Sequence, residues 1–97
     1  MYYILFYEVI GDHVTRRAPY REEHLRLLNE AHERGELVMA GALSEPVDGA
    51  VLIFCADDAT VPRRFAERDA YVRNGLVTRW KVRGWNVVVG APSSGTA

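Results

Sequence analysis

The chain has 97 residues, a single cysteine and a net charge of −1, with 12 Lys and Arg against 13 Asp and Glu. This length fits one small domain, and a lone cysteine excludes a disulfide framework within the chain. Basic residues never gather without acidic neighbours, which argues against a nucleic-acid-binding surface. No apolar run approaches the roughly 18 residues of a membrane span, and the first residues lack a basic leader. We therefore expect a cytoplasmic protein without nucleic-acid or membrane partners.

The first half of the chain predicts a strand, a helix and a second strand. Residues 2–9 are rich in β-branched and aromatic side chains, and both alternating sets are largely apolar, so this strand should be covered on both faces. Residues 18–35 predict a helix with Pro19 in its first turn and Gly35 as its stop. Its inward stripe contains Tyr20, His24, Leu27, Leu28 and Ala31. Residues 37–43 predict the second strand.

The second half repeats this order after a turn at residues 44–49. A third strand is expected over residues 50–56, again apolar on both faces. Possible caps at Asp57, Asp58 and Thr60 precede a second helix that runs toward Asp69. A last strand or strand pair follows, interrupted at Gly84. We expect residues 1–90 to form one domain and residues 91–97 to be a flexible tail.

The order strand, helix, strand, strand, helix, strand is typical of the ferredoxin-like α+β fold. This βαββαβ unit has an antiparallel sheet with both helices on one face. Because the strands are apolar on the opposite face as well, a second copy packed sheet to sheet would cover it. We therefore expect a homodimer, and the sequence leaves higher assembly open.

Two polar residues, His24 and Asp69, extend the inward stripes of the two helices. A charge alone in a core is costly, so the pattern predicts that the two groups meet. A carboxylate that binds one imidazole nitrogen leaves the other as a base near neutral pH. Metal-ligand spacing and a nucleophile motif are missing, which favours chemistry without a metal or cofactor. The structural alternative is a satisfied core histidine and an aspartate that begins a loop.

Four further residues are candidates for ligand binding. Arg17 lies before the first helix, where it could bind an anionic group, although such residues are commonly solvated. Tyr20 and Tyr71 could line a pocket, or simply pack at its rim. Gly41, in the middle of a strand, indicates close approach of a ligand or of a crossing helix.

Taken along its length, the chain resembles proteins of the YCII-related domain family. The resemblance rests on the order and spacing of "YYILFYE", "RRAPYREEHLRLLNEAHERGEL", "MAGAL", "PVDGAVLIF", "DAYVRNGLV" and "VRGWNVV". It implies a dimeric α/β barrel built from ferredoxin-like protomers. It also implies a His–Asp pair as the active site, and the matching positions are His24 and Asp69.

One position departs from the family pattern. Family members commonly have proline after the aspartate, where this chain has Ala70, while Tyr71 keeps the following aromatic residue. Proline would bias the aspartate away from helical geometry, so without it the second helix could run on and shift the carboxylate. Related dimeric barrels include muconolactone isomerases and small monooxygenases, which suggests a pocket for small cyclic or aromatic compounds.

The sequence thus favours a cofactor-independent enzyme that uses His24 and Asp69 for proton transfer, elimination or lactone-type hydrolysis on a small ring compound. A non-catalytic module that binds a small molecule in the same pocket is one alternative. A purely accessory dimer is another. The substrate is not specified by any of these residues.

Overall fold

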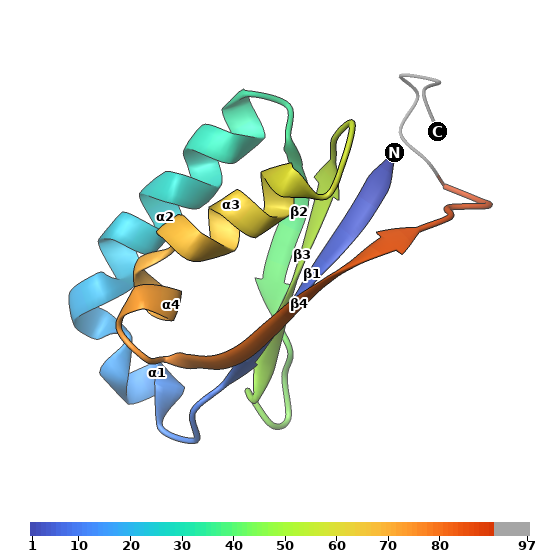
Figure 1. Cartoon of the computed structure of the whole chain (residues 1–97). Coiled ribbons are helices and arrows are strands. Elements are labelled where there is room, and N and C mark those ends of the chain that lie inside the picture. Colours follow the sequence, from blue (N-terminus) through green and yellow to red (C-terminus); the bar gives the residue numbers. More distant parts are fainter. Residues whose placement is uncertain (91–97) are drawn as a thin grey trace.

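The computed structural model describes residues 1–90, which form a four-stranded antiparallel sheet with helices on one face (Figure 1). The strand order β2-β3-β1-β4 and the helix placement confirm the predicted ferredoxin-like α+β fold. The predicted tail at residues 91–97 lies outside the described residues. The elements are β1 (Tyr2–Val9), α1 (His13–Arg16), α2 (Ala18–Glu33), β2 (Leu37–Ala42), β3 (Gly49–Cys55), α3 (Thr60–Arg68), α4 (Ala70–Arg73) and β4 (Val77–Trp85).

The core lies between the sheet and the helices. In the central strand β1, Leu5 pairs with Leu52 of β3 and Val82 of β4. These three aliphatic side chains form a row across the strands on the helix-covered face. Phe54 packs edge to face on Phe65 of α3, with ring centroids 5.4 Å apart. Burial of each such side chain contributes roughly 1.5–3 kcal/mol. This packing fixes the helices over the strands.

The two long helices begin and end near the predicted residues. Pro19 lies in the first turn of α2, and Gly35 follows its end with φ +79°, a left-handed conformation that glycine adopts without strain. Before α3, the Asp58 carboxylate accepts a hydrogen bond from the Thr60 backbone N–H at 2.8 Å. Of the three predicted caps, Asp58 is therefore the residue whose side chain accepts a backbone N–H at the start of α3.

Helix α3 ends at Arg68, so Asp69 does not extend its inward stripe as predicted. Asp69 is extended (φ −68°, ψ 127°), and the short helix α4 begins at Ala70. The Asp69 carboxylate accepts the Tyr71 backbone N–H, an N-cap geometry that short polar side chains favour over helix continuation. The missing proline at position 70 therefore does not let α3 run on. Helices α1 and α4 were not predicted, because four residues are too few to show helical periodicity.

The last strand also differs from its prediction. Instead of an interruption at Gly84, β4 runs unbroken from Val77 to Trp85. Gly84 pairs with Tyr3 of β1, and a Cβ built on Gly84 would meet side-chain atoms only at 3.5 Å or more. The glycine therefore fits within the ladder without a break.

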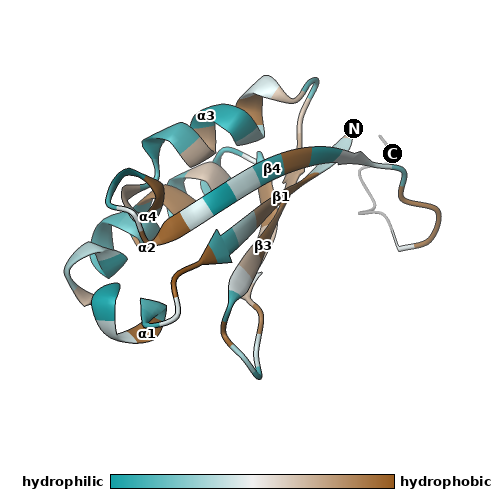
Figure 2. Cartoon of the chain, turned by 60° about the horizontal axis from the view of Figure 1, so that its bottom comes forward, coloured by the Kyte–Doolittle hydropathy of each residue, from teal (hydrophilic) through white to brown (hydrophobic). Residues whose placement is uncertain are grey.

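The face of the sheet that no helix covers is apolar along its middle. It carries Ile4 and Phe6 of β1 opposite Ile53 and Val51 of β3, all only partly buried. We call these four residues the open sheet face. On β4, next to β1, this face becomes polar. The Lys81 Nζ atom lies 5.4 Å from the centroid of the Phe6 ring. Figure 2 shows hydrophilic and hydrophobic residues alternating along β4.

Candidate active site

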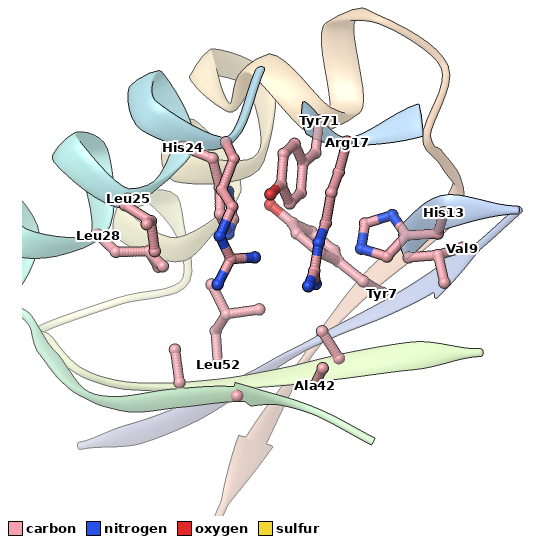
Figure 3. A pocket seen from close by; sticks show the side chains of 14 residues that line it. Tyr7, Val9, His13, Arg17, His24, Leu25, Leu28, Ala42, Leu52 and Tyr71 are labelled. Atoms are coloured by element: carbon pink, nitrogen blue, oxygen red, sulfur yellow. The ribbon is translucent and has the colours of Figure 1, made fainter. Parts of the chain in front are cut away.

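A pocket of about 230 Å³ lies between α2 and the sheet (Figure 3). Leu52 and Ala42 form part of its floor, and Leu25 and Leu28 of α2 form an apolar wall. Fourteen residues line the pocket, and none of them is Asp or Glu. The polar lining residues are Tyr7, His13, Arg17, Arg21, His24 and Tyr71.

Directly behind this lining, Asp69 is fully buried and accepts three hydrogen bonds. The Tyr7 hydroxyl donates to Oδ2 at 2.8 Å, and the Tyr71 backbone N–H donates to Oδ1 at 3.0 Å. His24 Nδ1 lies 2.8 Å from the same Oδ1. A buried carboxylate is tolerated when donors surround it in this way. The donors come from β1, α2 and α4, so the carboxylate joins three elements that are distant in sequence.

His24 presents its ring between the carboxylate and the pocket. Because a carboxylate accepts hydrogen bonds, Nδ1 carries the proton and Nε2 keeps a free lone pair. Among the described residues, no group is hydrogen-bonded to Nε2. The ring stacks on Tyr71, with centroids 3.8 Å apart and planes 11° from parallel. His24 is thus fixed in orientation on two sides.

Tyr7 acts as a donor in this cluster. Burial raises the pKa of its hydroxyl far above the ordinary value, and the neighbouring Asp69 charge and hydrogen bond raise it further. The raised pKa favours the protonated phenol, which can donate to the carboxylate. It holds Oδ2 while His24 and the Tyr71 N–H hold Oδ1.

A second polar group lies on the other side of Tyr71. The His13 ring meets Tyr71 edge-on at 5.2 Å, and its Nδ1 is buried without a hydrogen-bond partner. Burial lowers the pKa of His13, and Arg17, His24 and Arg21 lower it further, so its neutral form is favoured. The Tyr71 hydroxyl is also buried and makes no hydrogen bond of normal geometry. Burial raises its pKa, while the Arg21 and Arg17 charges and the close approach of the Arg21 guanidinium to the hydroxyl oppose that shift.

The structure brings together most of the predicted site residues. His24 and Asp69 are in contact, and Arg17, Gly41 and Tyr71 line the pocket. Tyr20 does not line it and instead packs, half-buried, against the core. At Gly41, a Cβ would meet nothing within 4 Å, so no crossing helix approaches this glycine.

Sequence reasoning missed Tyr7, His13 and Arg21. Tyr7 belongs to an apolar alternating strand in which a tyrosine is read as core, and its partner Asp69 is 62 residues away. His13 follows Gly11-Asp12, a pair that predicts a loop, and the helix that orients it has only four residues. Arg21 lies one turn after Arg17, and this spacing is the one signal that could have indicated it.

The comparisons with known proteins agree with this fold. The model of the YCII-related domain matches residues 1–86. The chain belongs to the YCII-related domain family. A search of curated proteins gives no match to it. Among the 90 described residues, no helix is long and apolar enough to cross a membrane, and no three His, Cys, Asp or Glu side chains gather in a way that could hold a metal ion.

Solved structures with the same fold include a characterised protein. This is 5-chloro-2-hydroxyhydroquinone dehydrochlorinase (TftG) from Burkholderia phenoliruptrix, solved in complex with 2,5-dihydroxybenzoquinone. The match has a TM-score of 0.74 and 18% identity, and it covers 89% of this chain and 94% of that one.

Two further structures match less closely. A NIPSNAP domain protein from Burkholderia xenovorans has a TM-score of 0.55 and 13% identity, covering 94% of this chain and 97% of that one. A protein from Agrobacterium tumefaciens has a TM-score of 0.54 and 16% identity, covering 95% and 98%. At these identities the likeness concerns the fold.

Proposed function

We propose that this protein is a cofactor-independent acid–base enzyme in which His24 exchanges a proton with a small ring compound and Asp69 orients His24. The observation that carries the proposal is the 2.8 Å contact between His24 Nδ1 and the fully buried Asp69 carboxylate, at the wall of a pocket. This contact leaves Nε2 as the reactive nitrogen. A histidine held in this way at a pocket wall is suited to general acid–base catalysis.

The surroundings of His24 favour both of its protonation states in turn. In the resting state, Asp69 fixes the tautomer with the proton on Nδ1, so Nε2 accepts a proton from the ligand. The resulting imidazolium lies against the carboxylate and stacks on the Tyr71 ring, whose π face attracts a cation. Tyr7 and the Tyr71 N–H keep the carboxylate in place during this cycle.

Elimination from a substituted ring is the reaction that we favour. The base would take a proton from the ligand while a leaving group departs with its electron pair, and no oxidant or reductant is consumed. Support comes from the dehydrochlorinase activity in the name of the structural neighbour, which shares 18% identity with this chain. Isomerisation by proton transfer and lactone-type hydrolysis use the same base and belong to the same proposal.

Turnover assays on His24 and Asp69 variants test this function. With a panel of chlorinated hydroxyhydroquinones and halide release as the readout, we expect His24→Asn and Asp69→Asn to lower kcat by about 10²–10⁴-fold. His32→Asn is a matched control, because His32 is exposed on the same helix. Full turnover by His24→Asn would contradict the proposal. Tight binding of a ligand without turnover across the panel would favour the alternative, a non-catalytic binding module.

We also propose that two copies associate through the open sheet face. Ile4, Phe6, Val51 and Ile53 form an apolar strip that no helix covers, and the dimeric barrel type pairs protomers through such faces. Light scattering during gel filtration should give twice the mass of one chain. Ile53→Lys should shift the protein to monomers, whereas Glu22→Lys on the helix side should not.

A further inference from the structure

The formal charges of the pocket lining are positive. Arg17 and Arg21 are the only lining residues that carry a permanent charge, and neither forms an ion pair with any residue in the range 1–90. The other arginines of α2 and its ends behave differently: Arg26 pairs with Glu30, and Arg34 pairs with Glu36. The Asp69 carboxylate, behind the lining, already accepts three hydrogen bonds from other groups. The two guanidinium groups at the pocket are therefore without a counter-ion.

Two buried polar atoms at the same end of the pocket also lack partners. His13 is 5% exposed and its Nδ1 has no hydrogen bond, and Tyr71 is 3% exposed and its hydroxyl has none of normal geometry. Buried polar groups are nearly always satisfied, so unsatisfied ones at a pocket wall indicate a missing partner. Figure 3 shows the His13 ring directed toward the Arg17 side chain, which extends into the pocket.

We propose that Arg17, Arg21, His13 and Tyr71 form an oxyanion subsite that selects ring compounds bearing a carboxylate or phenolate oxygen. The guanidinium groups supply charge-assisted hydrogen bonds. The Tyr71 hydroxyl donates one more, and a neutral His13 donates through Nδ1 in the tautomer that carries its proton there. His13 Nδ1 and the Arg17 guanidinium thereby gain a partner, and Tyr71 and Arg21 gain one in addition to their contact with each other.

The remaining lining limits the size and shape of the compound. The floor and wall are aliphatic, formed by Leu25, Leu28, Ala42 and Leu52, so the body of the ligand is apolar. A volume of about 230 Å³ lies below the roughly 300–1,000 Å³ typical of drug-sized ligands, which fits a single ring. His24 lies on the other side of Tyr71 from His13. The anionic oxygen would therefore anchor the ring while another edge meets His24.

This inference rests on the proposed function only in treating the pocket as the substrate site, so a binding experiment tests it separately from turnover. Benzoate and benzamide have nearly the same shape and differ in charge. Calorimetry on the full chain should show benzoate binding at least about tenfold more tightly than benzamide, a difference of 1.4 kcal/mol. Addition of NaCl should reduce this preference, because both guanidinium groups are partly open to solvent.

Variants that remove a charge or a hydroxyl test which residues cause the preference for benzoate over benzamide. Arg17→Gln/Arg21→Gln should bring the ratio of the two dissociation constants to about one, and Tyr71→Phe should reduce it by a smaller factor. Arg26→Gln is the matched control: it removes the same charge from the exposed side of α2 and should keep the wild-type ratio.

Several outcomes would overturn the subsite. They are equal binding of the two probes to the wild-type chain, no detectable binding of benzoate at millimolar concentration, or a preference that the double variant retains. Conversely, His24→Asn should keep the preference for benzoate. If His24→Asn also keeps full turnover, the proposed function fails while the subsite stands.

Discussion

The two sides of Tyr71 treat polar groups in opposite ways. On the His24 side, the Asp69 carboxylate receives three donors from three separate elements. Around His13, an imidazole nitrogen is buried without a partner, the Tyr71 hydroxyl has only the nearby Arg21 guanidinium, and Arg17 and Arg21 pair with no carboxylate of residues 1–90. The first group is complete in the unliganded chain, whereas the second would be completed by a ligand. Under the two proposals, one part of the site would transfer protons from a fixed geometry and the other would recognise the ligand.

Loss of the carboxylate should have the largest effect on stability. Asp69→Ala leaves the Tyr7 hydroxyl and the Tyr71 N–H buried without an acceptor. We expect the free energy of unfolding to fall by about 2–4 kcal/mol. Urea denaturation followed by circular dichroism measures this change. A loss below about 0.5 kcal/mol would show that the three hydrogen bonds contribute little to the fold.

Removal of one donor should have an intermediate effect. Tyr7→Phe leaves Oδ2 of Asp69 unpartnered in the core, which should cost about 1–3 kcal/mol. Tyr3→Phe is the matched control, because Tyr3 lies on the same strand and its hydroxyl takes part in none of the hydrogen bonds of the described residues. Equal stability losses in the two variants would contradict a special role for Tyr7.

The stability of the protein should depend on His13 at mildly acidic pH. The pKa of His13 is lowered in the folded state, mainly by burial, so the unfolded chain binds a proton more readily below about pH 6.5. The free energy of unfolding should therefore be at its full value above this pH and should decrease as the pH falls below it. In His13→Asn this decrease should be shallower, as measured by urea midpoints between pH 7.5 and pH 5 in the same buffers. A variant with the wild-type slope would assign the decrease to other groups.

The smallest change is expected from the second phenol. Tyr71→Phe removes a hydroxyl that is buried without a normal hydrogen bond, so stability should change by no more than about 0.5 kcal/mol, or increase. The chemical change is the same as in Tyr7→Phe, and only the surroundings differ. A loss as large as that of Tyr7→Phe would remove the contrast between the two sides of Tyr71.

The sequence predicted the fold well because its signals are local. Pro19 and Gly35 mark the ends of α2, and the alternation of residues 2–9 marks a central strand. The meeting of His24 and Asp69 was also predicted, although Asp69 lies on no helical stripe. It is buried as the cap of α4, which is too short to leave a periodic pattern.

Tyr7 and His13 carry no local signal that marks them as site residues. Tyr7 donates to a residue 62 positions away, and nothing in an apolar strand distinguishes this tyrosine from one that only packs. His13 is buried because α1 turns it toward Tyr71, and the sequence around it is typical of a loop. Tyr20 was predicted as a pocket residue from its inward position on α2. This position places it against the core and outside the pocket lining.

The three-donor arrangement around Asp69 has a consequence for substitutions at position 24. His24 supplies only one donor, and the other two come from Tyr7 and from a main-chain N–H that every residue except proline provides. A replacement at position 24 would therefore alter reactivity while the scaffold still holds its acid group. We therefore expect a substitution at position 24 to leave Asp69 with two of its three donors.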